Sequence, residues 1–188
     1  MINKNKHKLS KTRIVNFTIE ALDFLLGIPE SFILGFDRKE FYRIMNGMPT
    51  EKVLTTSNIC KLFNQFKKSG YVEIVQESGS ESIVFTNKAR LAVIDKLADR
   101  IKSDSRLRFI SFDIPERLST NRDKFRRTIK RLGFVQIQKS LWVCDKNIGD
   151  LVQMAAEEYK VDQYVVYIAA NETNINSTIE QMIRKRDH

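Results

Sequence analysis

The sequence predicts an α+β protein with two domains, and three observations carry this prediction. Residues 14–85 have the pattern of three helices followed by a two-stranded hairpin. Residues 106–170 have the pattern strand, helix, strand, strand, helix, strand. A short polar segment, Lys102–Ser105, separates the two patterns. We therefore expect a basic tail over residues 1–13, a first domain with a connector helix over 14–103, a second domain over 106–170 and a C-terminal tail over 171–188.

The charge of the chain favours an anionic partner. Its 188 residues contain 42% hydrophobic and 29% charged residues, which is the balance of an ordinary folded protein. The formal net charge is +9, and such a charge most often accompanies nucleic-acid binding. The first 103 residues carry 17 Lys and Arg against 11 Asp and Glu, so the first domain is the more basic one.

Several common kinds of site are excluded by composition. The two cysteines, Cys60 and Cys144, lie far apart, so we expect buried thiols in a reducing compartment rather than a disulfide framework or a zinc site. His7 and His188 lie near the two ends, which argues against a histidine-based catalytic triad. Neither a phosphate-binding glycine loop nor an apolar run of membrane-spanning length occurs. A cytoplasmic location is expected.

Three helices open the first domain. Apolar spacing predicts the first over Ile14–Leu26. Asp37 and Glu40 form a capping box that begins the second helix, which ends at Asn46-Gly47. The third begins among the good cap residues Thr55–Asn58 and stops at Ser69-Gly70.

The third helix and the segment after it suggest a DNA-binding module. Its apolar residues fall on one face at spacings of three and four, namely Ile59, Leu62, Phe63 and Phe66. A hairpin follows, with strands Tyr71–Val75 and Ser82–Phe85 joined by the turn Glu77–Ser80. This order is that of a winged helix-turn-helix domain, in which the last helix enters the major groove and the hairpin forms the wing. The segments SGYVEIV and VFTNKAR also resemble the recognition helix end and wing of bacterial winged-helix regulators.

The candidate DNA-binding residues of this domain are polar and face away from the apolar stripe. Asn and Gln can pair with adenine edges, Lys can reach guanine or phosphate, and Ser or Thr near a helix start can bind phosphate. The candidates are Thr56, Ser57, Asn58, Lys61, Asn64, Gln65, Lys67 and Lys68 on the helix, with Ser78 and Ser80 at the wing. The alternative is an ordinary solvated face. Residues 1–13 are either a mobile tail or a basic arm that contacts phosphate.

The second domain reads as a ferredoxin-like βαββαβ fold. A strand over Arg108–Ile114 is stopped by Pro115, and a helix capped by Thr120, with Asp123 at its third position, ends at Gly133. A hairpin, a helix capped by Asn147 and a last strand complete the order; the expected strands are Phe134–Gln138, Leu141–Cys144 and Gln163–Ile168. The first helix of this second domain carries several basic residues. They either contact the DNA backbone in a dimer or form an ordinary solvated face; these residues are Arg122, Arg126, Arg127 and Lys130.

The second domain also carries a family resemblance. The segments FISFDIPE, RLGF and QIQKSLWV resemble the core of PaaX-type transcriptional repressors, and that core resembles the small CRISPR adaptation protein Cas two. The PaaX resemblance implies a homodimeric double-stranded-DNA-binding repressor whose repression is relieved by an acyl-CoA-type ligand. No cofactor is expected for such a regulator.

The Cas-two resemblance implies a rival function. Asp113 matches the strand-end aspartate of that family, so it is the candidate catalytic and metal-binding residue of a Mg²⁺- or Mn²⁺-dependent nuclease, with a CRISPR integrase as a further partner. One Asp per chain suffices only if a dimer pairs two of them. Glu116 is a candidate helper. The alternative is that Asp113 caps the loop after its strand.

A symmetric homodimer is expected under either function. The edge strands of a small ferredoxin-like domain need covering, and we expect the aromatic residues Trp142, Tyr164 and Tyr167 to take part in that contact.

Overall fold

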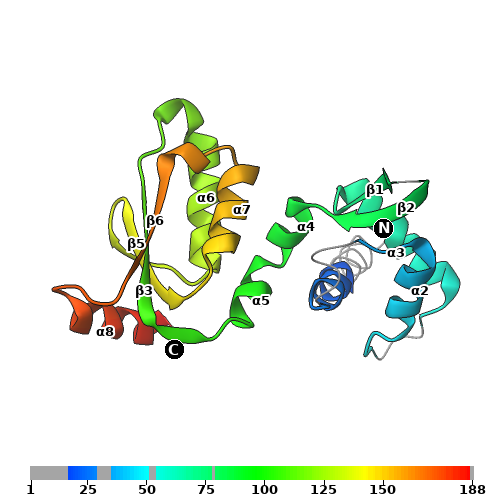
Figure 1. Ribbon diagram of the computed structural model, residues 1–188, viewed down its shortest axis with the longest axis horizontal. Helices are drawn as coiled ribbons and strands as arrows, with labels where there is room; N and C mark the ends of the chain where they lie inside the picture. Colours follow the sequence, from blue (N-terminus) through cyan, green and yellow to red (C-terminus); the bar gives the residue numbers. More distant parts are fainter. Residues whose placement is uncertain (1–16, 29–34, 51–53, 78, 187–188) are drawn as a thin grey trace, which may run out of the picture. The chain divides into compact units, whose positions relative to one another are not determined.

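The computed structural model describes residues 17–28, 35–50, 54–77 and 79–186 (Figure 1). It is an α+β structure that divides into two compact units, Met1–Val93 and Ile94–His188. The expected connector helix is not continuous, because it is divided into α4 (Asn87–Ala92) and α5 (Ile94–Asp99). At Val93 the backbone leaves the helical region, with φ −119° and ψ 23°. The basic tail expected over residues 1–13 lies outside the described residues.

The first unit contains the helices that the sequence predicted. One covers residues 17–26, and the others are α2 (Arg38–Asn46) and α3 (Thr56–Ser69). The Asp37 side chain accepts a hydrogen bond from the Glu40 amide at 2.7 Å, which confirms the predicted cap of α2. Thr55 caps α3 by accepting from the Asn58 amide at 3.3 Å.

A hairpin follows α3 directly. Gly70 has φ 68°, a left-handed conformation that glycine adopts without strain, and it turns the chain from α3 into β1 (Val72–Glu77). β1 pairs antiparallel with β2 (Ser80–Phe85). Two backbone hydrogen bonds of 3.1 and 2.7 Å join Phe36 to Ile83, so the segment before α2 adds a bridge to the outer side of the hairpin.

An aromatic cluster holds the helices of the first unit against the hairpin. The rings of Phe41 and Phe63 meet edge to face at 5.2 Å, and those of Phe36 and Phe85 at 5.5 Å. Phe66 completes the cluster beside Phe41. All five side chains are buried, and each such ring removes a large apolar area from water. The cluster therefore fixes the orientation of α3 relative to β1 and β2.

The second unit has the expected βαββαβ order, with an additional helix at its end. Its elements are β3 (Ser103–Phe112), the short 3-10 helix η2 (Glu116–Leu118), α6 (Ser119–Arg131), β4 (Val135–Gln138), β5 (Leu141–Lys146), α7 (Gly149–Glu158), η3 (Asp162–Tyr164), β6 (Val165–Ala170) and α8 (Asn176–Arg186). The sheet is antiparallel in the order β4-β5-β3-β6. This is the topology of a split βαβ, or ferredoxin-like, fold.

The sheet is covered on both faces. Figure 1 shows α6 and α7 on one side of it and α8 on the other. Phe112 of β3 meets Phe125 of α6 at 5.4 Å, whereas Phe109, on the opposite face of the same strand, packs against α8. Both faces of β3 are therefore buried, and this strand forms the centre of the unit.

Helix α8 belongs to this unit and is not a separate tail. Ile179 and Ile183 pack with Phe109 and Val143, and Ile179 is fully buried. Arg186 donates to the carbonyl of Gly133 and lies 3.5 Å from a carboxylate oxygen of Asp145. The boundary expected at residue 170 therefore falls inside the packed structure.

Several predicted boundaries in the second unit were wrong. β3 covers Ser103–Phe112 instead of Arg108–Ile114, so the polar segment Lys102–Ser105 that was expected to separate the domains runs into this strand. α6 begins at Ser119 with no side-chain cap, because η2 precedes it and Leu118 donates to the Pro115 carbonyl at 2.9 Å; the Thr120 and Asp123 capping box is not used. α7 likewise begins without a cap from Asn147. β6 starts at Val165 instead of Gln163, since η3 occupies the preceding residues. The predicted end of α6 at Gly133 is confirmed by its φ of 89°.

Within the described part of the chain, no helix combines the length and the apolar character that crossing a membrane requires.

Candidate nucleic-acid interface and a basic pocket

Helix α3 presents a polar stripe to solvent. Ile59, Leu62, Phe63 and Phe66 are buried on one side of the helix. Ser57, Lys61, Asn64 and Lys68 are exposed, and their spacings of four, three and four residues place them in one row along the opposite side. The row follows directly from the apolar pattern, because the buried face fixes which residues point outward.

The remaining predicted residues of α3 flank this row. Thr56, Asn58, Gln65 and Lys67 are exposed as well. The Gln65 side-chain nitrogen donates to the Ser69 hydroxyl at 3.2 Å, which holds this amide along the helix surface. All eight helix residues predicted from the sequence are thus solvent-accessible on a single helix.

The hairpin contributes no positive charge from its strands. β1 reads VEIVQE and β2 reads SESIVF, and Glu73 and Glu81 are exposed. Gly79, at the turn, has φ 85°. Of the two predicted wing residues, Ser78 lies outside the described residues, and so does the side chain of Ser80. Between α3 and the described part of the hairpin, the positive charge therefore comes from α3.

The basic residues predicted on α6 are not equivalent. Arg122 is paired with Glu116 at 2.8 Å, and the hydrogen bond from this guanidinium lowers the pKa of the Glu116 carboxyl below its usual value. Arg126 and Lys130 lie over the Trp142 ring, at 5.9 and 5.8 Å from its centroid.

Arg127 and Arg131 are both exposed to solvent, and Arg131 pairs with Asp95 at 2.7 Å. Acidic neighbours therefore already match some of the positive charges on the predicted basic face of α6.

Asp113 is exposed just after β3. Its backbone amide donates to the Tyr164 carbonyl at 3.2 Å, which ties this loop to the segment before β6. The candidate helper Glu116 is engaged by Arg122. Among the described residues, no group of three or more His, Cys, Asp or Glu side chains is placed to hold a metal ion.

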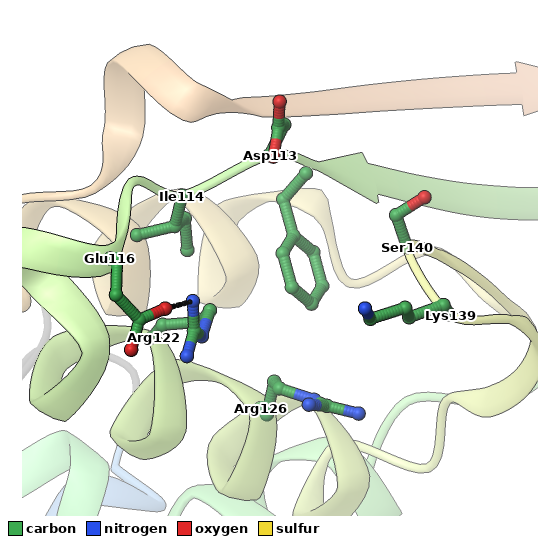
Figure 2. Close-up of a pocket in the computed structure, with 8 residues that line it drawn as sticks. Asp113, Ile114, Glu116, Arg122, Arg126, Lys139 and Ser140 are labelled. Atoms are coloured by element: carbon green, nitrogen blue, oxygen red, sulfur yellow. Dashed lines mark hydrogen bonds and ion pairs between the residues drawn. The ribbon is translucent and has the colours of Figure 1, made fainter.

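A pocket of about 380 Å³ opens beside Asp113. It is lined by Phe112, Asp113, Ile114, Glu116, Arg122, Arg126, Lys139 and Ser140. Figure 2 shows Arg122 beside Glu116 on one side of the pocket and Lys139 beside Ser140 on the other, whereas Asp113 lies across from Arg126. Lys139 and Ser140 were not predicted from the sequence, because their position depends on the β4–β5 turn reaching the end of β3.

The aromatic residues expected at a dimer contact are placed differently. Trp142 is only 1% exposed, so the expectation that it covers an edge was wrong; it packs beneath α6 instead. The Tyr164 hydroxyl accepts from Arg117 at 3.2 Å. On the edge strand β6 the large exposed apolar residues are Val166 and Ile168, at 56% and 46% exposure.

The comparison with protein families concerns the second unit. Residues 101–182 match the model of the PaaX protein central Cas2-like domain. The chain carries a PaaX-type, Cas2-like domain. This match runs from just before β3 into α8, so it agrees with the packing of that helix against the sheet. It confirms the resemblance seen in FISFDIPE, RLGF and QIQKSLWV. No curated protein and no solved structure matches the chain.

Proposed function

We propose that this protein is a homodimeric transcriptional regulator of PaaX type that binds double-stranded DNA through its first unit. The main observation in support is a row of exposed residues on α3, directly opposite the buried face of the helix: Ser57, Lys61, Asn64 and Lys68. The Cas2-like domain of PaaX type supports the same class of protein. Repression at a promoter is the mode of regulation that we infer from that family, and a cytoplasmic location follows from a DNA target.

The arrangement of the first unit supports a winged helix-turn-helix domain. α2 and α3 are followed without a spacer by the β1–β2 hairpin, and Phe36 pairs with the hairpin through Ile83. α3 contains 14 residues and is therefore about 21 Å long. A helix of this size fits into the major groove of B-DNA, where base edges are distinguishable.

The chemistry of the exposed row suits such a groove. An Asn64 side chain offers both a donor and an acceptor, which matches the edge of adenine. Lys61 and Lys68 lie on either side of it along the helix, where they would meet guanine or phosphate oxygen. The first-turn residues Thr56 and Ser57 lie at the positive end of the helix dipole and add hydroxyl donors for phosphate.

The second unit supplies the surface for a dimer. β6 is an edge strand whose outer backbone groups have no strand partner in the described part of the chain. Val166 and Ile168 are exposed on the same face of this strand. Exposed β-branched residues on an open edge favour pairing with another strand, and a second copy of the domain provides one. A dimer would present two α3 helices to two DNA half-sites.

The DNA-binding proposal is tested with mixed-sequence duplex DNA and fluorescence anisotropy over a range of salt concentrations. We expect the wild type to bind with strong salt dependence, because lysines that neutralise phosphates release counterions. Replacing both Lys61 and Lys68 with Ala should weaken binding and reduce the salt slope by about 2. A matched control replaces the exposed Lys160 and Lys185 of the second unit, which removes the same charge.

The proposal fails if both double variants bind alike, since net charge rather than the α3 row would then explain the affinity. The dimer is tested separately by light scattering. A wild-type mass near 21.9 kDa would contradict it, as would a dimer that survives Val166→Lys combined with Ile168→Lys.

A further inference from the structure

The pocket in the second unit is built by three segments that hold one another in place. The end of β3 is tied to the β4–β5 turn, because the Phe112 amide donates to the Ser140 carbonyl at 3.2 Å. Hydrogen bonds from the Gln136 side chain also stabilise the β4–β5 turn, since this amide donates to the carbonyls of Gln138 and Lys139 at 3.2 and 3.3 Å. The first turns of α6 form the third wall. The backbone that carries Lys139 and Ser140 is therefore fixed beside α6.

Two cations in this pocket have no acidic partner in the part of the chain that the structure describes. Arg122 is matched by Glu116, but Arg126 and Lys139 form no ion pair there. Arg126 lies against the buried Trp142 ring, which restricts its guanidinium without neutralising the charge. Figure 2 shows Lys139 entering the pocket from the side opposite Ile114 and Glu116. The pocket thus holds two unmatched positive charges and the Ser140 hydroxyl.

Apart from Asp113, which lies across from Arg126, and Glu116, which is paired with Arg122, the remaining lining is apolar. Phe112 and Ile114 line the pocket and are 6% and 4% exposed. The Phe112 ring is fixed edge to face against Phe125. A volume of about 380 Å³ lies within the range of small-molecule sites, which are mostly apolar with a few placed polar groups.

We propose that this pocket binds the phosphate group of a small organic ligand, with the apolar body of the ligand on Phe112 and Ile114. A phosphate monoester carries close to two negative charges near neutral pH, which matches the two unpaired cations. The planar guanidinium of Arg126 is suited to two phosphate oxygens, and Lys139 provides a point charge. Ser140 supplies a neutral donor. The proposal does not depend on DNA binding by α3.

Phenyl phosphate is a suitable probe, because it joins a phosphate monoester to an aromatic ring. Titration calorimetry with the full chain should show saturable binding, and inorganic phosphate should bind more weakly because it lacks the apolar body. Arg126→Gln and Lys139→Gln should each weaken binding on the order of 10-fold. Arg127→Gln is the matched control, since this neighbour on α6 is exposed and does not line the pocket; it should bind as the wild type does.

Arg126→Gln could disturb the packing of α6 on Trp142. Lys139 is exposed on a turn, so Lys139→Gln still tests the pocket without that disturbance. Absence of saturable binding to the wild type would overturn the proposal, and so would an equal loss in Arg127→Gln. A competition experiment with duplex DNA shows whether the pocket binds a small ligand or the phosphate of the DNA backbone. Duplex DNA that displaces phenyl phosphate equally from the wild type and from Lys61→Ala with Lys68→Ala would also refute the proposal, because phosphate of the DNA backbone would then occupy the pocket itself. Retention of phenyl phosphate in the presence of duplex DNA is the expected result.

Discussion

Replacement of Ile179 by Ala tests whether α8 is part of the Cas2-like domain. Ile179 is fully buried in a cluster with Phe109, Val143 and Ile183. The change removes three carbon groups, each worth about 0.8 kcal/mol of transfer free energy, so about 2.4 kcal/mol is lost before any cavity is counted. The cavity adds to this, and we expect the free energy of unfolding to fall by about 2–4 kcal/mol.

Urea unfolding followed by tryptophan fluorescence measures this loss. The single tryptophan, Trp142, is buried in the second unit, so its emission reports the unfolding of that unit. Gln181→Ala is the control, because Gln181 is exposed on the same helix, and it should change stability by less than about 0.5 kcal/mol. A loss below about 1 kcal/mol for Ile179→Ala would refute the packing of α8, as would equal effects of the two substitutions.

Three further predictions concern the cysteines and Asp113. Burial raises the pKa of the Cys144 thiol to about 12, so at pH 8 a thiol reagent should modify the partly exposed Cys60 and reach Cys144 only on unfolding; rapid modification of both would contradict this. The pKa of Cys144 in the folded protein lies above its ordinary value near 9, so the neutral buried thiol contributes fully to stability below about pH 9. This contribution declines between about pH 9 and 12. Cys144→Ala should remove this decline, which melting temperatures measured across the pH range would show. Little or no nuclease activity is expected with Mg²⁺ or Mn²⁺ on single- or double-stranded DNA and RNA. Glu116 is held by Arg122, and the described residues contain no group of three or more acidic, His or Cys side chains placed to hold a metal ion. Cleavage that is lost in Asp113→Ala and in chelator would instead support the metal-dependent nuclease.

Local patterns in the sequence were sufficient to predict the elements near the proposed DNA interface. The spacing of Ile59, Leu62, Phe63 and Phe66 determines the buried side of α3, and the exposed row then follows without knowledge of the tertiary structure. The cap at Asp37 and the left-handed Gly70 are similarly local features, because each depends on one residue and its immediate neighbours.

Tertiary contacts explain what the sequence did not predict. Trp142 appeared to be an edge residue, but Arg126 and Lys130 of α6 cover it in the folded domain. The segment after residue 170 is polar enough to look like a tail, and only the contact with Phe109 and Val143 shows that Ile179 and Ile183 are core residues. The pocket combines residues from β3, α6 and the β4–β5 turn, which no local pattern relates.

The most direct test of the regulator proposal is selection of duplex DNA from a random library by the full-length protein, followed by binding measurements on the recovered sequence. We predict enrichment of a motif with two related half-sites, since a symmetric dimer presents two copies of α3. Asn64→Ala should cost about 1–3 kcal/mol on that motif and leave binding to mixed-sequence DNA unchanged. Recovery of no shared motif, or full affinity of Asn64→Ala for the selected site, would contradict base recognition by α3.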